Sequence, residues 1–385
     1  MNPRIRVAHL ATVDMGLRYL LLNQMRYLAA CGYEVTGISA HGPDVPFLEQ
    51  AGIPHLAVPF NRRPFDPVQD LKGFWHLVHL LRRERFTILH THNPKPTFYG
   101  QIAARLAGIP IVVNTLHGFY FHERTHPLLR RVFIAMETVA ASCADVILSQ
   151  NREDIDTAIQ EGICPAWKVR PLGNGIDLSR FSARVAPAER ARCKERLGLA
   201  ATQPVVGFVG RLVREKGIPE LLEACRILRQ IEPELRLLLV GPSDPDKPDA
   251  IAVDEEGVLA LGLRHDLPEL YAAMDVCCLP SHREGYPRVP MEACAMGVPC
   301  VVTDIRGCRE VVDPDVNGLR VPVKNPQALM EALRRVLHEP DRAERYAKAA
   351  RRIAEERFDE RRVFDTVRAE YARLLKQRGI PLPPG

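Results

Sequence analysis

The chain has 385 residues, enough for two domains that each bury a core of their own. Its composition, with 46% hydrophobic and 26% charged residues, is ordinary for a soluble globular protein. The net charge of +5 is too mild for a nucleic-acid-binding protein, and it favours anionic ligands or an anionic membrane surface.

The cysteines and the N-terminus indicate the compartment. None of the ten cysteines forms a C-x-x-C pair, and several lie in apolar runs, which is typical of reduced thiols in a cytosolic protein. Residues 1–9 lack the apolar region and cleavage site of a signal peptide, and no uncharged apolar stretch is long enough to cross a membrane. We therefore expect a cytoplasmic protein that could still be peripheral on the inner face of the cytoplasmic membrane.

The first half of the chain alternates strands and helices. Strands are expected over residues 5–12, 34–39, 54–59, 87–90, 109–115 and 145–149, and helices over 17–31, 66–85, 97–107, 127–143 and 151–161. The first strand, a turn with Gly16, the first helix and the next strand make a βαβ unit, whose helix N-terminus can hold a phosphate. One glycine without G-x-G-x-x-G is a weak signal, so a plain strand-to-helix turn is an equal alternative.

Helix 66–85 carries large aromatic residues and lies in a basic stretch. Between residues 61 and 86, six lysines and arginines face three acidic residues. Such a helix could lie on an anionic membrane surface, and a solvated basic face is the alternative.

Turn-forming residues between 171 and 190 mark the main boundary, and the strand–helix pattern then begins again. Strands are expected over 205–210, 235–241, 275–279 and 298–303, with a helix over 218–230. The pattern predicts an α/β fold of two doubly wound domains in tandem, residues 1–175 and 176–360. Residues 377–385, which end in Pro-Leu-Pro-Pro-Gly, are expected to form a frayed tail.

Two carboxylates eight positions apart, Glu284 and Glu292, follow the buried strand 275–279. Pro290 suits the first position of a helix and Gly297 its end, so Glu284 should lie on a loop at the strand's C-terminal end and Glu292 in the first helical turn. Ligands usually bind at this edge of an α/β sheet. The alternative is that Glu292 only complements the helix dipole and Glu284 is solvated.

Two metal-like motifs are false matches. His122-Glu123-Arg124-Thr125-His126 fits the zinc protease pattern H-E-x-x-H, but Pro127 follows at once and a helix carrying both histidines is not expected. Asp313 to Lys324 begins like a calcium loop, but its twelfth position is a lysine where a glutamate is needed. A turn at Asn317-Gly318 between two strands is the favoured interpretation.

After these motifs are set aside, the sequence still indicates an anion-binding site. No P-loop lysine motif or nucleophile elbow is present. Arg211 and Lys216 flank a loop between a strand and a helix in the second domain, and together with Gly16 they could clamp a diphosphate.

These residues resemble the E-x7-E family of retaining GT-B glycosyltransferases, glycosyltransferase family 4, group 1. The resemblance covers nearly the whole chain and rests on motifs in the family's order: His90-Thr91-His92, Thr115 to Phe119, Asn174 to Asp177, Gly210 to Gly217, Asp275 to Ser281, Glu284 with Glu292, and Asn317 to Leu319. The first half is similar to bacterial members that build surface polysaccharide or lipopolysaccharide.

The resemblance implies two Rossmann-like domains facing a cleft that holds a nucleotide-sugar, with UDP-sugars favoured by family frequency. The acceptor would be a lipid-linked glycan, lipopolysaccharide or exopolysaccharide, and no metal or other cofactor would take part. The sugar would be transferred with retention of anomeric configuration. The family also returns its last helix, here about 361–376, to the first domain.

The resemblance also implies residue roles. Arg211 and Lys216 would neutralise the donor diphosphate, Glu284 would contact the donor sugar, and Glu292 would accept hydrogen bonds from the ribose. His117 would bind the sugar from the first domain. Five more residues are assigned to donor binding by position: Gly16, where relatives often carry two glycines, Gly210, Arg264, Gly285 and Tyr286.

Three other functions stay open at this point. A GT-B nucleotide-sugar epimerase would need no acceptor. An inactive homologue would bind the nucleotide-sugar without turnover. A zinc protease would require the H-E-x-x-H motif to bind metal.

Overall fold

The computed structural model describes residues 4–60, 66–92, 94–121, 125–181, 186–243 and 249–383. Its contacts divide the chain into two compact units. Unit 1 comprises Met1–Gly173 with Arg362–Gly385, and unit 2 comprises Asn174–Arg361. The sequence places this boundary after residue 175.

Unit 1 is built on a parallel sheet of seven strands in the order β3-β2-β1-β4-β5-β6-β7. The strands are β1 (Arg6–Val13), β2 (Glu34–Ala40), β3 (His55–Ala57), β4 (Ile88–His92), β5 (Ile111–Leu116), β6 (Val146–Ser149) and β7 (Val169–Pro171). Strands β1 to β6 were expected from apolar runs, whereas β7 is too short to show a period. The strand order reverses between β1 and β4. Ligands of α/β proteins usually bind at the C-terminal ends of the two strands that flank such a reversal.

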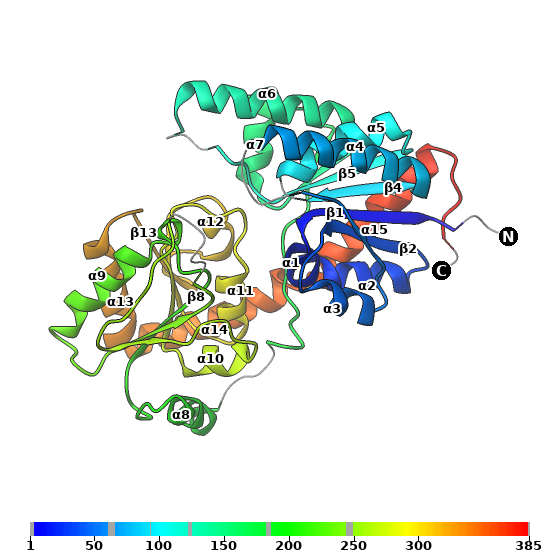
Figure 1. The fold of residues 1–385 in the computed structure, drawn as a ribbon. Helices are drawn as coiled ribbons and strands as arrows, with labels where there is room; N and C mark the ends of the chain where they lie inside the picture. The colour runs from blue at the N-terminus through cyan, green and yellow to red at the C-terminus, as the bar shows by residue number, and fades with distance from the viewer. Residues whose placement is uncertain are drawn as a thin grey trace. The chain divides into compact units, whose positions relative to one another are not determined.

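Helices cover both faces of this sheet (Figure 1). They are α1 (Asp14–Gly16), the π turn η1 (Leu17–Leu21), α2 (Leu22–Ala30), α3 (Val45–Gln50), α4 (Pro67–Glu84), the π turn η2 (Pro96–Gly100), α5 (Gln101–Ala107), α6 (Pro127–Cys143) and α7 (Arg152–Gln160). One core cluster joins α2 to the sheet, and another joins α4 and α5 to it.

The last helix, α15 (Glu360–Gln377), supplies core residues to unit 1. Val367, Tyr371 and Leu375 are fully buried in the cluster that contains α2 and strands β1, β4 and β5. The helix ends in an ordered cap, because the Ile380 N–H donates to the Leu375 carbonyl and Arg378 pairs with Asp145 at 2.8 Å. The frayed-tail prediction is therefore wrong for residues 378–380.

Unit 2 has a parallel sheet of six strands in the order β10-β9-β8-β11-β12-β13. The strands are β8 (Val205–Val209), β9 (Arg236–Val240), β10 (Val258–Ala260), β11 (Val276–Leu279), β12 (Cys300–Thr303) and β13 (Gly318–Val321). The helices are α8 (Pro187–Arg196), the 3-10 turn η3 (Arg214–Lys216), α9 (Ile218–Arg229), α10 (Leu267–Ala273), α11 (Arg288–Ala295), α12 (Cys308–Val311), α13 (Pro326–His338) and α14 (Pro340–Arg357). The strand order reverses between β8 and β11, which brings the loops after these two strands together.

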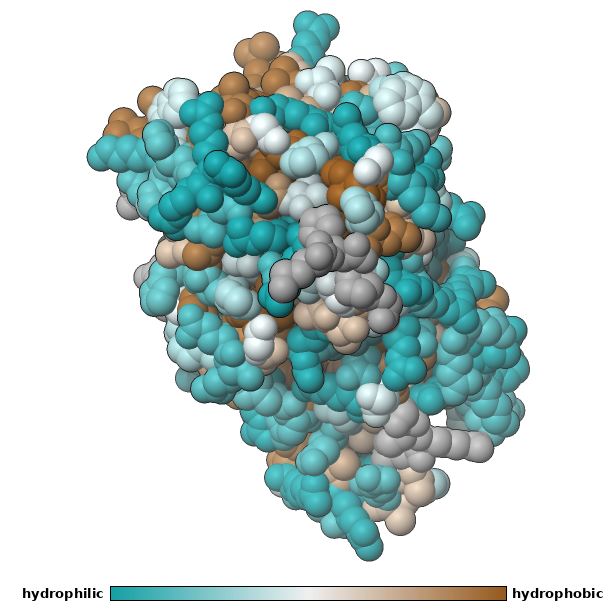
Figure 2. All heavy atoms as spheres, turned by 90° about the vertical axis from the view of Figure 1, so that its right-hand side faces the viewer, coloured by the Kyte–Doolittle hydropathy of each residue, from teal (hydrophilic) through white to brown (hydrophobic). Residues whose placement is uncertain are grey.

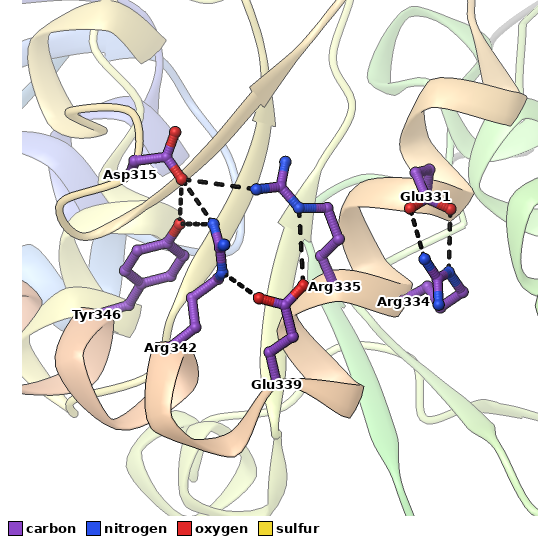
Figure 3. Close-up of polar contacts among 7 residues, drawn as sticks. All are labelled: Asp315, Glu331, Arg334, Arg335, Glu339, Arg342 and Tyr346. Carbon is purple, nitrogen blue, oxygen red and sulfur yellow. Dashed lines mark hydrogen bonds and ion pairs between the residues drawn. The ribbon is translucent and has the colours of Figure 1, made fainter.

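The calcium-like stretch is a surface network of ion pairs (Figure 3). One Asp315 oxygen accepts from Arg342 at 2.8 Å and from the Tyr346 hydroxyl at 2.7 Å, so this carboxylate is engaged by protein donors. Buried Asn317 bonds the backbone of Asp313 and Val311, and the turn lies between α12 and β13 rather than between two strands.

The second histidine of the zinc-protease pattern lies outside a helix. His126 is the residue before α6 and has an extended ψ of 131°. Residues 122–124 lie outside the described residues. The ten cysteines are all described and none is paired. Among the described helices, none combines the length and apolar character needed to cross a membrane.

Candidate active site

Three loops of unit 2 meet at the C-terminal strand ends and are pinned by close backbone contacts. Gly217 has φ +71°, and a Cβ there would lie 2.1 Å from the Pro280 carbonyl oxygen. Gly307 has φ +73°, and a Cβ there would lie 2.1 Å from the Gly285 carbonyl oxygen. Only glycine fits such positions, so the loops after β8, β11 and β12 are held in fixed relation.

Lys216 and Glu284 form an ion pair across two of these loops. The Nζ of Lys216 lies 2.5 Å from Glu284 Oε1, which also accepts from the Ser281 hydroxyl at 2.7 Å. The side chains are 19% and 12% exposed, so the pair is weakly screened by solvent. The family resemblance implies that these residues bind the phosphate and sugar ends of one donor, and the structure places them in direct contact.

The side chain of Arg211 lies near this ion pair but takes no part in it. Among the described residues, no hydrogen bond or ion pair engages its side chain, and it is half-buried on the loop after β8. Burial would raise the pKa of Glu215, but Arg283, Lys216 and Arg211 together hold it below its usual value. Arg283 pairs with Glu215 at 2.9 Å and Lys216 with Glu284, so the positive charge of Arg211 remains for a ligand.

The position of Glu292 in its helix differs from the predicted one. Helix α11 begins at Arg288, so Pro290 is its third residue and Glu292 lies in the second turn rather than the first. Gly297 follows the helix end with φ +69°, as the sequence predicts. The Tyr271 hydroxyl donates to Glu292 Oε2 at 2.8 Å. Burial raises the pKa of the Glu292 carboxyl, against the opposing effects of Arg288, Tyr271 and Arg180.

The remaining predicted residues of unit 2 surround these groups. Arg264 pairs with Asp266 at 2.5 Å, just before α10, the helix that carries Tyr271. Gly285 and Tyr286 continue the loop from Glu284, and the Tyr286 carbonyl accepts from Asn174 Nδ2 at 2.8 Å. Gly210 directly follows β8 and has φ +150°.

In unit 1, Gly16 and His117 follow β1 and β5. Helix α1 begins at Asp14, so Gly16 lies inside the first turn with an ordinary φ of −64° and no need for a glycine's freedom. The Asp14 carboxylate accepts from the Met15 and Asp44 N–H groups, so these two N–H groups already have a partner in the protein. The Nε2 of His117 lies 3.2 Å from His92 Nδ1. Burial lowers the pKa of His117 to about 4, against a hydrogen bond with Gln150.

Three histidines of unit 1, His9, His90 and His92, have ring nitrogens within 4.8 Å of one another. This is the one group of potential metal ligands found among the described residues. The His90 and His92 rings are stacked with centroids 4.3 Å apart, and the His9 and His92 planes differ by 16°. Stacked rings point their in-plane lone pairs in parallel rather than at one point, and both His90 nitrogens are engaged by hydroxyls of Tyr371 and Thr115. The cluster is therefore a hydrogen-bonded network rather than a formed metal site.

Sequence reasoning missed the partners that orient the carboxylates. Ser281 and Asn174 stand within quoted motifs, but their sequence positions do not reveal what they bond. Tyr271 gave no signal, because a tyrosine in an apolar helical pattern reads as a core residue. Asp275, another motif residue, lies at the opposite end of β11, where it binds Lys194 at 2.8 Å and the Val205 N–H at 2.8 Å.

Comparisons with known proteins agree on the class. Residues 189–353 match the model of glycosyl transferases group 1, and residues 16–175 match a glycosyl transferase 4-like domain. The chain is 30% identical over 346 residues to the UDP-Gal:alpha-D-GlcNAc-diphosphoundecaprenol alpha-1,3-galactosyltransferase of Escherichia coli, covering 87% of this chain and 88% of that protein. It is 26% identical over 385 residues to the capsular polysaccharide biosynthesis glycosyltransferase CapM of Staphylococcus aureus, covering 97% and 98%.

Solved structures share the fold. Anabaena HepE in complex with UDP-glucose superposes with a TM-score of 0.80 at 23% identity, covering 96% of this chain and 100% of that one. The lipopolysaccharide glycosyltransferase WaaG gives 0.73 at 19% identity, covering 91% and 95%.

Two parallel sheets with loop sites at their switch points define a GT-B fold, and the matched models define a glycosyltransferase. The chain belongs to the glycosyl transferases group 1 family. The epimerase alternative is not favoured, because the named relatives are glycosyltransferases.

Proposed function

We propose that the enzyme transfers a sugar from a UDP-sugar to a lipid-linked glycan of a surface polysaccharide, with retention and without a metal, at the inner face of the cytoplasmic membrane. The observation that carries this is the Lys216–Glu284 pair beside the unpaired Arg211 at the strand ends of unit 2. In a nucleotide-sugar the β-phosphate is bonded to the anomeric carbon, so groups for phosphate and sugar must lie together, as these two do.

Charge explains the assignment of the diphosphate. A metal-free site must supply positive charge from side chains, and charge-assisted hydrogen bonds from arginine and lysine are the strong ones. Arg211 would take the diphosphate directly, and Lys216 would turn one of its remaining protons to it while keeping Glu284. Glu284 would then bind a sugar hydroxyl with its second oxygen, and Glu292, oriented by Tyr271, would accept from the ribose.

The chemical step follows from these roles. The bond between the anomeric carbon and the phosphate oxygen breaks, and the acceptor oxygen attacks that carbon from the same face. The acceptor's hydroxyl proton passes to the departing phosphate oxygen, so no protein base is consumed. Arg211 and Lys216 stabilise the negative charge that develops on the leaving UDP. His117 of unit 1 would contact the donor sugar.

The relatives support the proposed substrates. The Escherichia coli relative is named as a UDP-galactose enzyme acting on a diphosphoundecaprenol-linked sugar, and a Campylobacter jejuni relative as an enzyme acting on another diphospho-undecaprenol-linked sugar. A shared fold with UDP-bound HepE is consistent with a UDP donor.

An apolar and basic surface of unit 1 supports membrane contact. Helices α4, α5 and α6 lie on one side of the sheet (Figure 1). On α6, four exposed side chains spaced by four, four and three residues share one face: Leu128, Val132, Met136 and Val139. Helix α4 exposes Val68, Leu71 and Trp75 beside the basic Lys72. Figure 2 shows brown hydrophobic side chains among teal ones at the top of the view.

The donor can be tested directly. We expect UDP-sugars to raise the melting temperature more than GDP- or ADP-sugars, because a ligand that binds only the native state stabilises it. Labelled donor and membrane lipid extract should then give a labelled polyprenyl-linked product, with the donor's anomeric configuration by NMR. Stabilisation by GDP- or ADP-sugars alone would contradict the proposed donor. A product with inverted anomeric configuration would contradict retention, and loss of activity when metal ions are removed would contradict a metal-free reaction.

A further inference from the structure

A column of histidines lies beneath His117 in unit 1. His9 on β1 and His90 and His92 on β4 are each at most 1% exposed. Apolar residues such as Val7 and Ile88 alternate with them on the face covered by α2 and α15. Burying imidazole rings in such a core costs free energy unless each ring is hydrogen-bonded.

Two of the rings form a chain that ends at His117. The Nδ1 of His9 lies 3.0 Å from His92 Nε2, and His92 Nδ1 lies 3.2 Å from His117 Nε2. His90 stacks on His92 but bonds the hydroxyls of Tyr371 and Thr115, each at 2.7 Å. The route to His117 therefore passes through His9 and His92 and leaves His90 outside it.

The direction of the chain follows from counting protons. A neutral imidazole has one N–H, and His9 Nε2 has no hydrogen-bond partner among the described residues. If the bonds ran from His117 toward His9, the single proton of His9 would sit on that unpartnered buried nitrogen. Buried N–H groups without partners are rare and costly, so the bonds run from His9 Nδ1–H to His92, and from His92 Nδ1–H to His117 Nε2.

We propose that His92, held by His9, is a positioning residue that occupies Nε2 of His117 and keeps its single N–H on Nδ1. The inference rests on the proposed function, in which His117 contacts the donor sugar. A ring with one defined tautomer and a fixed orientation can meet a sugar hydroxyl in one geometry, whereas a free ring would sample both tautomers and several orientations.

The charges around the chain agree with this assignment. Among the described residues, the titratable groups linked to His117 by hydrogen bonds or ring stacking are His9, His90 and His92 of the sheet and, through His90, Tyr371 of α15. Burial lowers the pKa values of the three histidines, to about 3 for His9, and raises that of Tyr371. All four are therefore neutral at pH 7. The hydrogen bond with Gln150 favours protonated His117, as expected if Gln150 accepts from the ring.

Histidine-selective 15N NMR on the full chain tests the tautomer without relying on activity. In the wild-type protein at pH 7.5 we expect the His117 signal, identified by its loss in His117→Ala, to show the N–H on Nδ1. In His92→Phe we expect a mixture or the Nε2–H form, with kcat at least tenfold lower and the KM for donor within about threefold. In His92→Phe, the pH below which kcat falls should also rise toward 6.5, because Nε2 of His117 can then bind a proton.

Two further variants keep the test decisive. His90→Phe removes a neighbouring ring that is not part of the hydrogen-bonded series His9–His92–His117. The His117 tautomer should therefore be unchanged, and kcat should stay within about twofold of wild type. His92→Asn can place an amide N–H where Nδ1 was, so it should restore the tautomer and part of kcat, even if His92→Phe folds poorly. An unchanged His117 tautomer in His92→Phe, or equal losses of kcat in His92→Phe and His90→Phe, would overturn the inference. If the His117 tautomer changes in His92→Phe but His117→Ala keeps the wild-type kcat, then His92 does position His117, and the proposed contact of His117 with the sugar is wrong.

Discussion

Arg211 and Lys216 carry positive charge at the same strand end, but they differ in what they already bind. Arg211 has no ion-pair partner among the described residues, so Arg211→Ala should leave the melting temperature unchanged and lower kcat by about 10²–10³-fold. Lys216→Ala should lower kcat similarly and also destabilise unit 2 by about 1–3 kcal/mol, because Glu284 loses its cation. Calorimetry and donor kinetics measure both effects. Lys348→Ala on α14, a surface ion pair, is the control for loss of charge.

Glu292 and Tyr271 should act on donor affinity rather than on chemistry. The hydroxyl of Tyr271 donates to the carboxylate, so Tyr271→Phe frees the carboxylate without removing it. We expect Glu292→Gln to raise the KM for donor about tenfold or more, Tyr271→Phe to raise it less, and both to change kcat by less than about threefold. A collapsed kcat with unchanged KM in Glu292→Gln would instead make Glu292 an acid or base in the reaction.

At the scale of elements, the loops are held by glycine contacts. Gly217→Ala would place a Cβ against the Pro280 carbonyl at φ +71°, whereas Gly262 has φ +65° with nothing within 4 Å. Gly262→Ala should cost only the left-handed strain of about 1–2 kcal/mol, and Gly217→Ala should cost more and also lower kcat, because the loops of Lys216 and Glu284 must separate. Scanning calorimetry of the two variants compares the costs. Equal melting temperatures would show that the loop contact is not fixed.

The apolar stripe of α6 predicts how the enzyme meets its acceptor's membrane. We expect the wild-type protein to float with phosphatidylglycerol vesicles more than with phosphatidylcholine vesicles. Leu128→Asp with Val132→Asp should weaken this binding about tenfold or more, since both side chains lie on the exposed face. Ile231→Asp, which changes an exposed residue of unit 2, serves as control. Unaltered flotation of the α6 variant would exclude this helix from the contact.

Sequence patterns located the elements with long apolar periods and missed those without them. Helix α6 has the bounds predicted from its pattern, 127–143, because a proline fixes its start and its apolar residues repeat regularly. Strands β7 and β10 have three residues each, too few for a period. Helix α11 was placed two residues late because Pro290 is tolerated throughout the first turn, not only at its first position. The direct contact of Lys216 with Glu284 joins residues 68 positions apart, and such a pairing depends on tertiary structure alone.

At the scale of the whole molecule, the buried histidines predict acid sensitivity of unit 1. Burial lowers the pKa of His9 to about 3 and of His117 to about 4, and it lowers those of His90 and His92 as well. Below pH 6.5 the unfolded chain therefore binds protons that the folded unit does not. The free energy of unfolding should fall by up to about 1.4 kcal/mol per pH unit for each histidine. Burial raises the pKa of Glu137 to about 7, which acts in the opposite direction but involves a single group.

The measurement can be confined to unit 1, because both tryptophans of the chain, Trp75 and Trp167, lie in it. Urea unfolding followed by tryptophan fluorescence should show a lower midpoint at pH 5 than at pH 7.5. His76→Gln, at an exposed position on α4, should leave that difference intact. A midpoint independent of pH would mean that the histidines are protonated in the folded unit.

The membership of α15 in unit 1 has a consequence for how the protein is made. Residues 362–385 complete a core that begins at residue 5, and the whole of unit 2 lies between them in the sequence. On the ribosome, unit 2 can therefore fold while the seven-stranded sheet of unit 1 still lacks Val367, Tyr371 and Leu375. Until α15 has been made, the part of that sheet's apolar face which α15 covers stays exposed, and exposed apolar surface is what chaperones bind. A truncation just before Val367 would thus damage the first domain synthesised and leave the second one whole.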